Sequence, residues 1–275
     1  IENFIKNKVV RGTILIADEG INGSISADTK TLTSILKYIK KLLFVRQFEI
    51  KINQVDFLPF NRIKIRVKNE IVSLGKEINE FNKKKGLFIE PSDWNNFIIQ
   101  KDVKLIDLRN DYEIEIGKFK RAINPKTKTF REFPKKIENM NLNKNDKIAI
   151  YCTGGIRCEK ASKYLFQEGY SKIYQLKGGI LNYLDYTKNS KAKSLWAGDC
   201  FVFDNRVTVN KKLEKGKYDQ CHGCRHPINK KDTKSYKYIK GVSCPKCYGL
   251  RSKEQKQNSF NRQKQIEAAE YEGRS

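Results

Sequence analysis

A reactive cysteine is indicated by the stretch Tyr151-Cys152-Thr153-Gly154-Gly155-Ile156-Arg157-Cys158. It follows an apolar run and precedes a helical pattern, so we expect Cys152 at the end of a buried strand, in a glycine-rich loop that leads into a helix. Loop N–H groups and the positive helix end favour the reactive thiolate. Arg157 is expected to close the loop and to hold an anionic substrate group. An isolated cysteine here would more often be structural, but two glycines and an arginine favour catalysis.

The length of this loop limits the kinds of reaction that Cys152 can carry out. Cys152 and Arg157 enclose four residues, one fewer than in the Cys-x5-Arg loop of cysteine phosphatases. A tighter ring of amides suits a persulfide sulfur better than a phosphate, so the residues alone indicate a sulfurtransferase. Cys158 lies six residues after Cys152. It can resolve an oxidised or persulfidated Cys152 as a disulfide, or it can be a small helix residue that packs inward.

A second motif near the C-terminus predicts a metal site. It consists of two Cys-x-x-Cys pairs separated by nineteen residues: Cys221 with Cys224, and Cys244 with Cys247. This is the spacing of a zinc ribbon, in which four thiolates close a tetrahedral structural Zn²⁺ site. A redox pair or two disulfides are the alternatives, and His222 and His226 are near enough to be substitute ligands. The segment is poor in large apolar residues, so a metal would stabilise its fold.

Composition and charge exclude several classes of protein. The 275 residues are 39% hydrophobic, which fits a folded chain and not a disordered one. No apolar run approaches the roughly 20 residues that span a bilayer, and we expect no contact with a membrane. Seven cysteines, an odd number, point to the reducing cytoplasm. The net charge of +25 favours a polyanionic partner such as nucleic acid, although an AT-rich genome also yields many lysines.

The chain is expected to form an α/β and α+β multidomain protein. We expect a ferredoxin-like (acylphosphatase-like) domain over residues 1–85, a parallel α/β domain over 86–190, a zinc-binding segment over 191–250 and a basic polar tail over 251–275. In the second domain, strands alternate with helical patterns, which predicts a parallel sheet with helices on both faces. Cys152 then lies at the carboxyl end of a strand, where such sheets place their sites.

The first domain is predicted to lack one strand. Residues 10–17, 24–27, 48–52 and 63–67 have strand patterns, and residues 18–23 are rich in Gly and Asn and predict a turn. Asp28 is expected to cap a helix over 29–43, and residues 1–8 form a partial helix. The first strand of the ferredoxin-like unit is therefore expected to precede Ile1. Residues 81–86 are polar and basic and are expected to be the linker.

The middle of the chain resembles the rhodanese superfamily. The similarity rests on the loop around Cys152, on residues 103–113 with Asp107 and Arg109 in supporting positions, on residues 117–125 and on residues 174–180. The whole chain resembles a more specific family, the tRNA uridine hydroxylases that contain a rhodanese domain. That similarity adds the motif with Glu19, Gly20, Asn22 and Gly23 (residues 17–23), residues 198–204 and the four metal-site cysteines.

This resemblance implies a function that the residues alone do not. It implies conversion of the wobble uridine of tRNA to 5-hydroxyuridine, with O2 as co-substrate and Cys152 as the active-site, persulfide-forming cysteine. The sequence contains no Gly-x-Gly-x-x-Gly fingerprint, and both histidines lie in the zinc segment, so the electron donor and the means of activating O2 stay unknown. A sulfurtransferase acting on tRNA or a small acceptor is the alternative, and an idle tRNA-binding module the third hypothesis. The oligomeric state is left open.

Overall fold

The chain divides into two compact units in the computed structural model, which describes residues 1–44, 49–78 and 84–272. The first unit comprises Ile1–Ser73 and a short return of the chain at Phe203–Asn205, and the second comprises Leu74–Val202 and Arg206–Ser275. Residues 81–83 of the expected linker lie outside the described residues.

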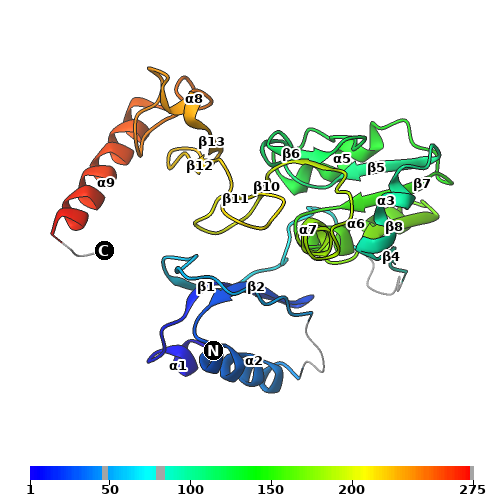
Figure 1. Ribbon diagram of the computed structural model, residues 1–275, viewed down its shortest axis with the longest axis horizontal. Helices are drawn as coiled ribbons and strands as arrows, with labels where there is room; N and C mark the ends of the chain where they lie inside the picture. Colours follow the sequence, from blue (N-terminus) through cyan, green and yellow to red (C-terminus); the bar gives the residue numbers. More distant parts are fainter. Residues whose placement is uncertain (45–48, 79–83, 273–275) are drawn as a thin grey trace. The chain divides into compact units, whose positions relative to one another are not determined.

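The first unit is a three-stranded sheet with a helix packed on one face (Figure 1). The elements are α1 (Glu2–Ile5), β1 (Arg11–Ala17), β2 (Gly20–Ser26), α2 (Thr29–Leu42) and β3 (Ile63–Val67). The central β1 pairs antiparallel with β2 and parallel with β3. Asp28 caps α2 by accepting a hydrogen bond from the Thr31 amide (2.9 Å), as expected. The apolar face of α2 buries Ile35 and Ile39 against the sheet.

Two expectations for this unit are wrong. The turn is confined to Asp18 and Glu19, because Gly20–Ser26 already forms β2 and pairs with β1 from Ala17 onward. The expected strand at 48–52 is absent over its described part, 49–52, where Ile52 is 78% exposed. The alternation of residue types was misleading there because a strand also needs a partner, and the described sheet pairs only β2, β1 and β3.

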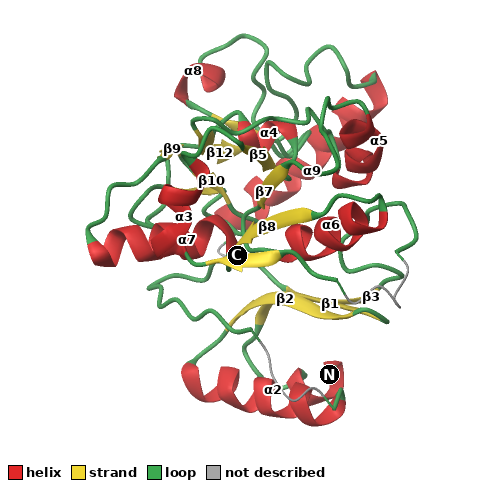
Figure 2. Cartoon of the chain, turned by 90° about the vertical axis from the view of Figure 1, so that its right-hand side faces the viewer, coloured by secondary structure: helices red, strands yellow, loops and turns green. Residues whose placement is uncertain are grey.

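The second unit contains the parallel sheet that was predicted. Its strands are β4 (Leu87–Ile89), β5 (Val103–Asp107), β7 (Lys147–Tyr151) and β8 (Lys172–Leu176), in the order β4-β8-β7-β5. Figure 2 shows α3 (Pro91–Ile98) and α7 (Gly179–Ser190) on one face, with α5 (Phe133–Glu138) and α6 (Ile156–Gln167) on the other. The short elements between them are α4 (Asp111–Ile114), β6 (Gly117–Phe119) and η1 (Phe130–Glu132). The helices on both faces confirm the predicted layering.

An aromatic cluster forms the core of this unit. The ring of Phe119 meets those of Trp94, Tyr151, Tyr183 and Trp196 edge-on, at centroid distances of 6.1, 4.9, 4.9 and 5.2 Å. Such edge-to-face pairs add stabilisation beyond the area that they bury. Because Tyr151 is the last residue of β7, this packing fixes the point at which the chain enters the cysteine loop.

The remaining residues of the second unit form short strand pairs and a final helix. β9 (Trp196–Gly198) pairs with β6, β10 (Cys200–Phe201) with β11 (Thr208–Val209), and β12 (Asp219–Gln220) with β13 (Pro227–Ile228). They are followed by α8 (Lys230–Thr233) and α9 (Lys253–Tyr271). The expected polar tail is thus a largely exposed helix. Among the described residues, no helix has the length and apolar character needed to cross a bilayer.

Candidate active site and metal centre

The loop after β7 surrounds the sulfur of Cys152 with backbone donors. The Gly155 amide lies 3.1 Å from Cys152 Sγ, and the Cys158 amide, which donates to the Gly155 carbonyl (2.9 Å), also favours the thiolate. Gly155 is the N-cap of α6 and has φ of +102°, a conformation that glycine adopts without strain. Gly154 forms an exposed tip, whereas Cys152 itself is 1% exposed. The sulfur therefore sits at the start of α6, as predicted from the spacing of the glycines.

The start of α7 holds the loop from behind. The amides of Ile180 and Leu181 donate to the carbonyls of Cys152 (2.9 Å) and Thr153 (3.1 Å). Gly179 has φ of +68°, and a Cβ there would lie 2.5 Å from the Cys152 carbonyl oxygen. Only glycine fits this close approach. The glycine pair that ends the rhodanese-like stretch of the sequence thus has a direct role in fixing the loop.

The environment of Cys152 stabilises its thiolate. Burial alone would raise the pKa of this thiol, but hydrogen bonds from the Cys158 thiol, the charge of Arg157 and the amides of Cys158 and Gly155 outweigh it. Together they lower the pKa of Cys152 to about 5. The thiolate is therefore the main form at neutral pH. Burial, the bond to Cys152 and its negative charge raise the pKa of Cys158 well above its usual value, so Cys158 remains a thiol.

Arg157 does not have a free guanidinium for a substrate. Its two Nη atoms bind the carboxylate oxygens of Glu113 at 2.7 and 2.9 Å, and Nη2 also lies 3.4 Å from Thr153 Oγ1. Arg157 is 7% exposed and Glu113 is fully buried. Because a buried carboxylate already binds both Nη atoms of Arg157, an anionic group of the substrate would have to compete with Glu113, and the role expected for Arg157 in holding the substrate stays a prediction. The positive charge still lies close enough to favour the Cys152 thiolate.

Glu113 was not among the expected site residues. It is the third residue of α4, and its carboxylate also accepts from the Asn110 amide (3.0 Å) in a capping box. The Asn-x-x-Glu spacing could have indicated this helix start. It could not have revealed the partner, since Arg157 lies 44 residues further along the chain.

Asp107 and Arg109 form a second buried pair that shapes the loops around the site. Arg109 Nη2 lies 2.6 Å from Asp107 Oδ2 and 2.6 Å from the carbonyl of Gly117, and Nη1 donates to the Glu113 carbonyl (3.1 Å). Both side chains are fully buried, and the guanidinium packs over the Trp196 ring at 5.0 Å. Arg109 thus ties β5, α4 and β6 together, which agrees with the supporting role expected for this pair.

Helix α4 also contacts the cysteine-rich segment. The Tyr112 ring packs edge-on against His226 at a centroid distance of 5.1 Å, and Glu115 forms an ion pair with Lys246. Between Tyr112 of α4 and Glu115, the C-cap of the same helix, Glu113 holds Arg157. One short helix therefore joins the cysteine loop to the segment that follows the parallel sheet.

The four cysteines of the C-terminal motif meet at one point. All four Sγ atoms lie within 4.8 Å of one another, and Cys221, Cys244 and Cys247 are buried. Sγ–Sγ distances of 4.0 Å (Cys221 to Cys247) and 3.7 Å (Cys224 to Cys244) are far longer than a disulfide bond. They match the separation of about 3.8 Å that Zn–S bonds of about 2.3 Å produce in a tetrahedron. The residues therefore fit a four-thiolate metal site. Within the described part of the chain, neither histidine belongs to this cluster.

The N-terminal motif forms the β1–β2 hairpin. Glu19 accepts a hydrogen bond from the Ile71 amide (2.5 Å), and Asn22 pairs with Leu15 across the two strands. A Cβ at Gly23 would lie 2.5 Å from the Thr13 carbonyl oxygen, and Gly20 has φ of +136°. The glycines of this motif are thus required by the hairpin itself. The motif belongs to the first unit and the cysteine loop to the second.

Comparison with known proteins places the whole chain. The model of the UPF0176 acylphosphatase-like domain matches residues 1–71, and that of the rhodanese-like domain matches residues 90–185. The tRNA uridine(34) hydroxylase of Teredinibacter turnerae is 44% identical over 272 residues, which cover 98% of this chain and 84% of that protein.

Among solved structures, a rhodanese-related protein from Thermoplasma volcanium is 26% identical over 36% of this chain and 92% of its own, with a TM-score of 0.31. A rhodanese-like domain protein from Staphylococcus aureus is also 26% identical, over 35% of this chain and 90% of its own, with a TM-score of 0.31. The match along nearly the full length decides the assignment: the chain belongs to the tRNA uridine(34) hydroxylase family.

Proposed function

We propose that this protein converts the wobble uridine of tRNA to 5-hydroxyuridine with O2, and that Cys152 is the reacting cysteine. The observation that carries the proposal is the 44% identity to a tRNA uridine(34) hydroxylase along 98% of the chain. The loop geometry supports the part assigned to Cys152, since it is the sulfur at the start of α6 whose pKa is lowered, to about 5. The enzyme acts in the cytoplasm, where its free thiols stay reduced.

Each residue of the loop has a role in this proposal. The Gly155 and Cys158 amides hold Cys152 as a thiolate. Arg157, fixed by Glu113, supplies positive charge beside the sulfur without leaving the loop. Asp107 and Arg109 keep α4, and with it Glu113, in place. Cys152 is then the catalytic residue, and the two buried ion pairs position it.

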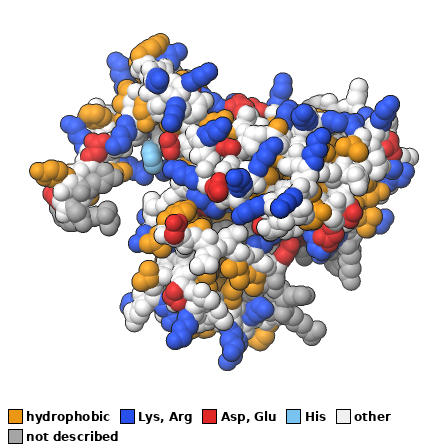
Figure 3. All heavy atoms as spheres, in the orientation of Figure 1, with side chains coloured by type: hydrophobic (Ala, Val, Ile, Leu, Met, Phe, Trp, Pro, Cys, Tyr) orange, Lys and Arg blue, Asp and Glu red, His pale blue; other side chains and the backbone are white. Residues whose placement is uncertain are grey.

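The segment with the four cysteines is proposed to bind tRNA. Lys and Arg outnumber Asp and Glu by ten to two over residues 221–256, compared with nineteen to thirteen over residues 90–188 and thirteen to seven over residues 1–73. A genomic bias toward lysine would enrich the three parts alike, so the excess in the C-terminal part needs a local reason. Figure 3 shows Lys and Arg side chains over this segment. Phosphates attract such a surface, and binding releases counterions.

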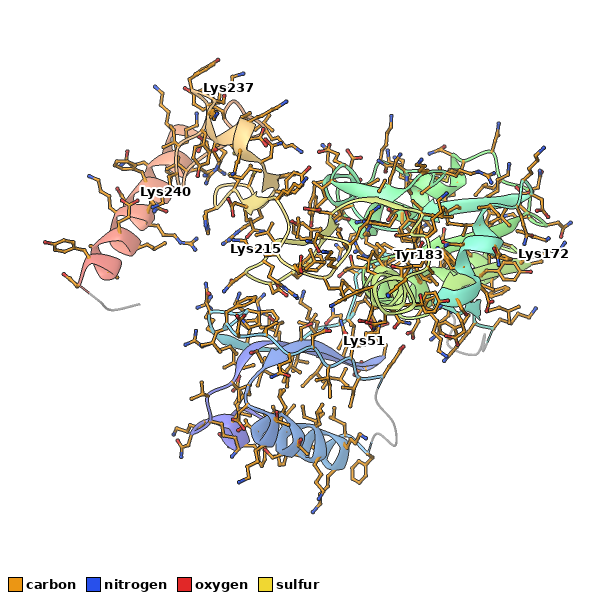
Figure 4. All side chains as sticks on the ribbon, viewed as in Figure 1. Lys51, Lys172, Tyr183, Lys215, Lys237 and Lys240 are labelled. Atoms are coloured by element: carbon orange, nitrogen blue, oxygen red, sulfur yellow. The ribbon has the colours of Figure 1, made fainter. Side chains whose placement is uncertain are left out.

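A tyrosine pair within this basic surface suits unpaired bases. Tyr236 is 80% exposed and meets Tyr248 edge-on at a centroid distance of 6.1 Å. Lys237 lies over the Tyr236 ring (5.6 Å) and Lys256 over the Tyr248 ring (4.5 Å). Figure 4 labels Lys237 and also Lys240, which pairs with Glu267 of α9 at 3.2 Å. Exposed rings flanked by cations are what single-stranded RNA loops stack on, and the wobble uridine lies in such a loop.

The metal in this segment is proposed to be Zn²⁺. The buried cluster there consists of Ile228 and three of the four cysteines, with Tyr238 packed against it. So few apolar groups do not stabilise a fold by themselves, and metal binding is then linked to folding. Zn²⁺ with four thiolate ligands has no open coordination position, so it organises the segment and takes no part in the reaction.

Binding of tRNA to this surface is tested by replacing Tyr236 with Ala. Loss of one stacked base removes about 1–3 kcal/mol, so the dissociation constant should rise about 5- to 150-fold. The control is Tyr271→Ala, which removes an even more exposed ring (94%) from the end of α9. Affinity should also fall steeply with salt. If Lys237 contacts a phosphate of single-stranded RNA, Lys237→Ala should reduce the slope of log association constant against log salt concentration by about 0.7. A salt-independent dissociation constant would exclude a phosphate-binding surface.

A sulfurtransferase is the second candidate, because a ring of amides around Cys152 also suits a persulfide. The two functions leave different nucleosides in tRNA. In cells that lack this gene, mass spectrometry of wobble nucleosides should show loss of 5-hydroxyuridine and its derivatives. The gene should restore them and its Cys152→Ser variant should not. Loss of thiolated uridine instead would favour the sulfurtransferase, and full modification by Cys152→Ser would remove Cys152 from the mechanism.

A further inference from the structure

Cys158 is a second thiol in contact with the proposed reacting sulfur. It is fully buried at the third position of α6, and its thiol donates a hydrogen bond to Cys152. Its own amide donates to the Gly155 carbonyl (2.9 Å), and the Gly155 amide lies 3.1 Å from Cys152 Sγ, so the same residue holds both cysteines. The site therefore holds a thiolate and a thiol side by side, one of low pKa and one that stays protonated. A pair of this kind has the composition of a dithiol that can close to a disulfide.

We propose that Cys158 is a catalytic redox residue, and that Cys152 and Cys158 together supply the two electrons that the hydroxylation requires. This inference rests on the proposed function. Replacing the C5–H of uridine by C5–OH with O2 consumes two electrons and two protons if the second oxygen atom leaves as water. Two thiols that become one disulfide release that amount. The overall reaction is uridine, O2 and two thiols to 5-hydroxyuridine, water and one disulfide.

The balance also holds when the reaction is divided into two steps. In the first, the O–O bond breaks, one oxygen atom forms the C5–OH group and the other becomes bound to the Cys152 thiolate as a sulfenate. In the second, the Cys158 sulfur attacks the Cys152 sulfur, the S–O bond breaks and hydroxide leaves with the thiol proton as water. A soluble dithiol reductant then restores both cysteines by thiol–disulfide exchange.

A simpler role for Cys158 has a different consequence. If Cys158 only donated a hydrogen bond that stabilises the thiolate, a serine hydroxyl would replace it. Cys158→Ser and Cys158→Ala therefore separate the two roles: both remove the redox group, but serine keeps a donor beside Cys152. Because a neighbouring thiol acts at an effective concentration far above that of a millimolar reductant, both variants should lose about a hundredfold in multiple-turnover rate. Equal loss in both identifies a redox role.

The test uses the fully reduced, metal-replete protein with tRNA, to which O2 is admitted without added reductant. The wild type should form one 5-hydroxyuridine and one Cys152–Cys158 disulfide per chain, found by peptide mass spectrometry. Cys158→Ser should form no more than one 5-hydroxyuridine and leave Cys152 as a sulfenic acid that dimedone traps. The control is Cys200→Ser, which removes another fully buried thiol, one that bonds to the Phe201 carbonyl and should keep its multiple-turnover rate.

Two results would overturn the inference. One is Cys158→Ser turning over as fast as the wild type, and the other is 5-hydroxyuridine forming in the wild type without the disulfide. Release of hydrosulfide together with the disulfide would also count against it, since that marks a persulfide on Cys152. Failure of the proposed function is distinct: the wild type would then make no 5-hydroxyuridine even with excess reductant. Thermal unfolding of each variant shows whether a loss of rate reflects a loss of fold.

Discussion

Replacing Arg157 with Met tests the part assigned to the buried ion pair. The substitution keeps an unbranched apolar stem, removes the guanidinium and leaves the Glu113 carboxylate buried without its partner. Breaking a buried pair in this way destabilises a protein by about 3–5 kcal/mol. For a unit of this size, each kcal/mol lowers the melting temperature by about 2–4 °C, so we expect a fall of about 6–20 °C.

The same substitution should change the chemistry of Cys152 in a known direction. The positive charge of Arg157 is one of the causes that lower the pKa of Cys152. Its loss leaves the negative Glu113 nearby, so the pKa of Cys152 should rise and the thiolate fraction at neutral pH should fall. The measurement is the thiolate absorbance of the protein against pH, taken as a difference from the Cys152→Ser variant.

A double variant separates stability from chemistry. Adding Glu113→Gln to Arg157→Met removes the uncompensated charge and keeps an acceptor for the Asn110 amide. The free energy of unfolding should return to within about 1–2 kcal/mol of the wild-type value. The fall of activity on the acid side of the pH profile should stay displaced to higher pH. The reasoning is refuted if Arg157→Met melts like the wild type, or if its Cys152 still ionises near pH 5.

Two further predictions concern pH and metal. The pKa of Cys152 is lowered from its ordinary value of 9.0 to about 5, so activity should be flat near neutral pH and fall as the pH drops through 5. The thiolate's contribution to stability is complete above about pH 9 and should be lost as the pH falls from there through 5. A fall in activity near pH 8 would contradict this. Removal of Zn²⁺, or the substitution Cys244→Ser, should make the segment from Cys221 to Arg251 sensitive to protease while the parallel sheet stays folded. A zinc content well below one per chain in freshly purified protein would contradict a structural zinc site, as would a segment that resists protease after chelation.

The sequence predicted the parts of the site that are local along the chain. Cys152 lies at the end of β7 because an apolar strand, two glycines and a helix follow one another within about twenty residues. The four cysteines meet because each pair has the spacing of a metal knuckle. In both places the geometry depends on neighbours in sequence, so residue types and spacing suffice.

The sequence could not predict the contacts that join distant residues. Arg157 seemed free to hold an anion because Glu113 is 44 positions away, and only the packing of α4 on the cysteine loop brings them together. Likewise, Gly20 and Gly23 suggested a wide turn, whereas Gly23 is needed because β1 approaches it closely. Glycine is common both in turns and where another backbone comes close, and only the position of the partner strand distinguishes the two.

The central claim is that Cys152 serves an oxygen-dependent hydroxylation of the wobble uridine. The most direct test is to incubate the purified, reduced protein with tRNA under isotopically heavy O2 and to analyse the wobble nucleoside by mass spectrometry. We predict 5-hydroxyuridine that carries the heavy oxygen with the wild type and no product with Cys152→Ser. Product whose oxygen comes from water, or labelled product from Cys152→Ser at the wild-type rate, would contradict the account.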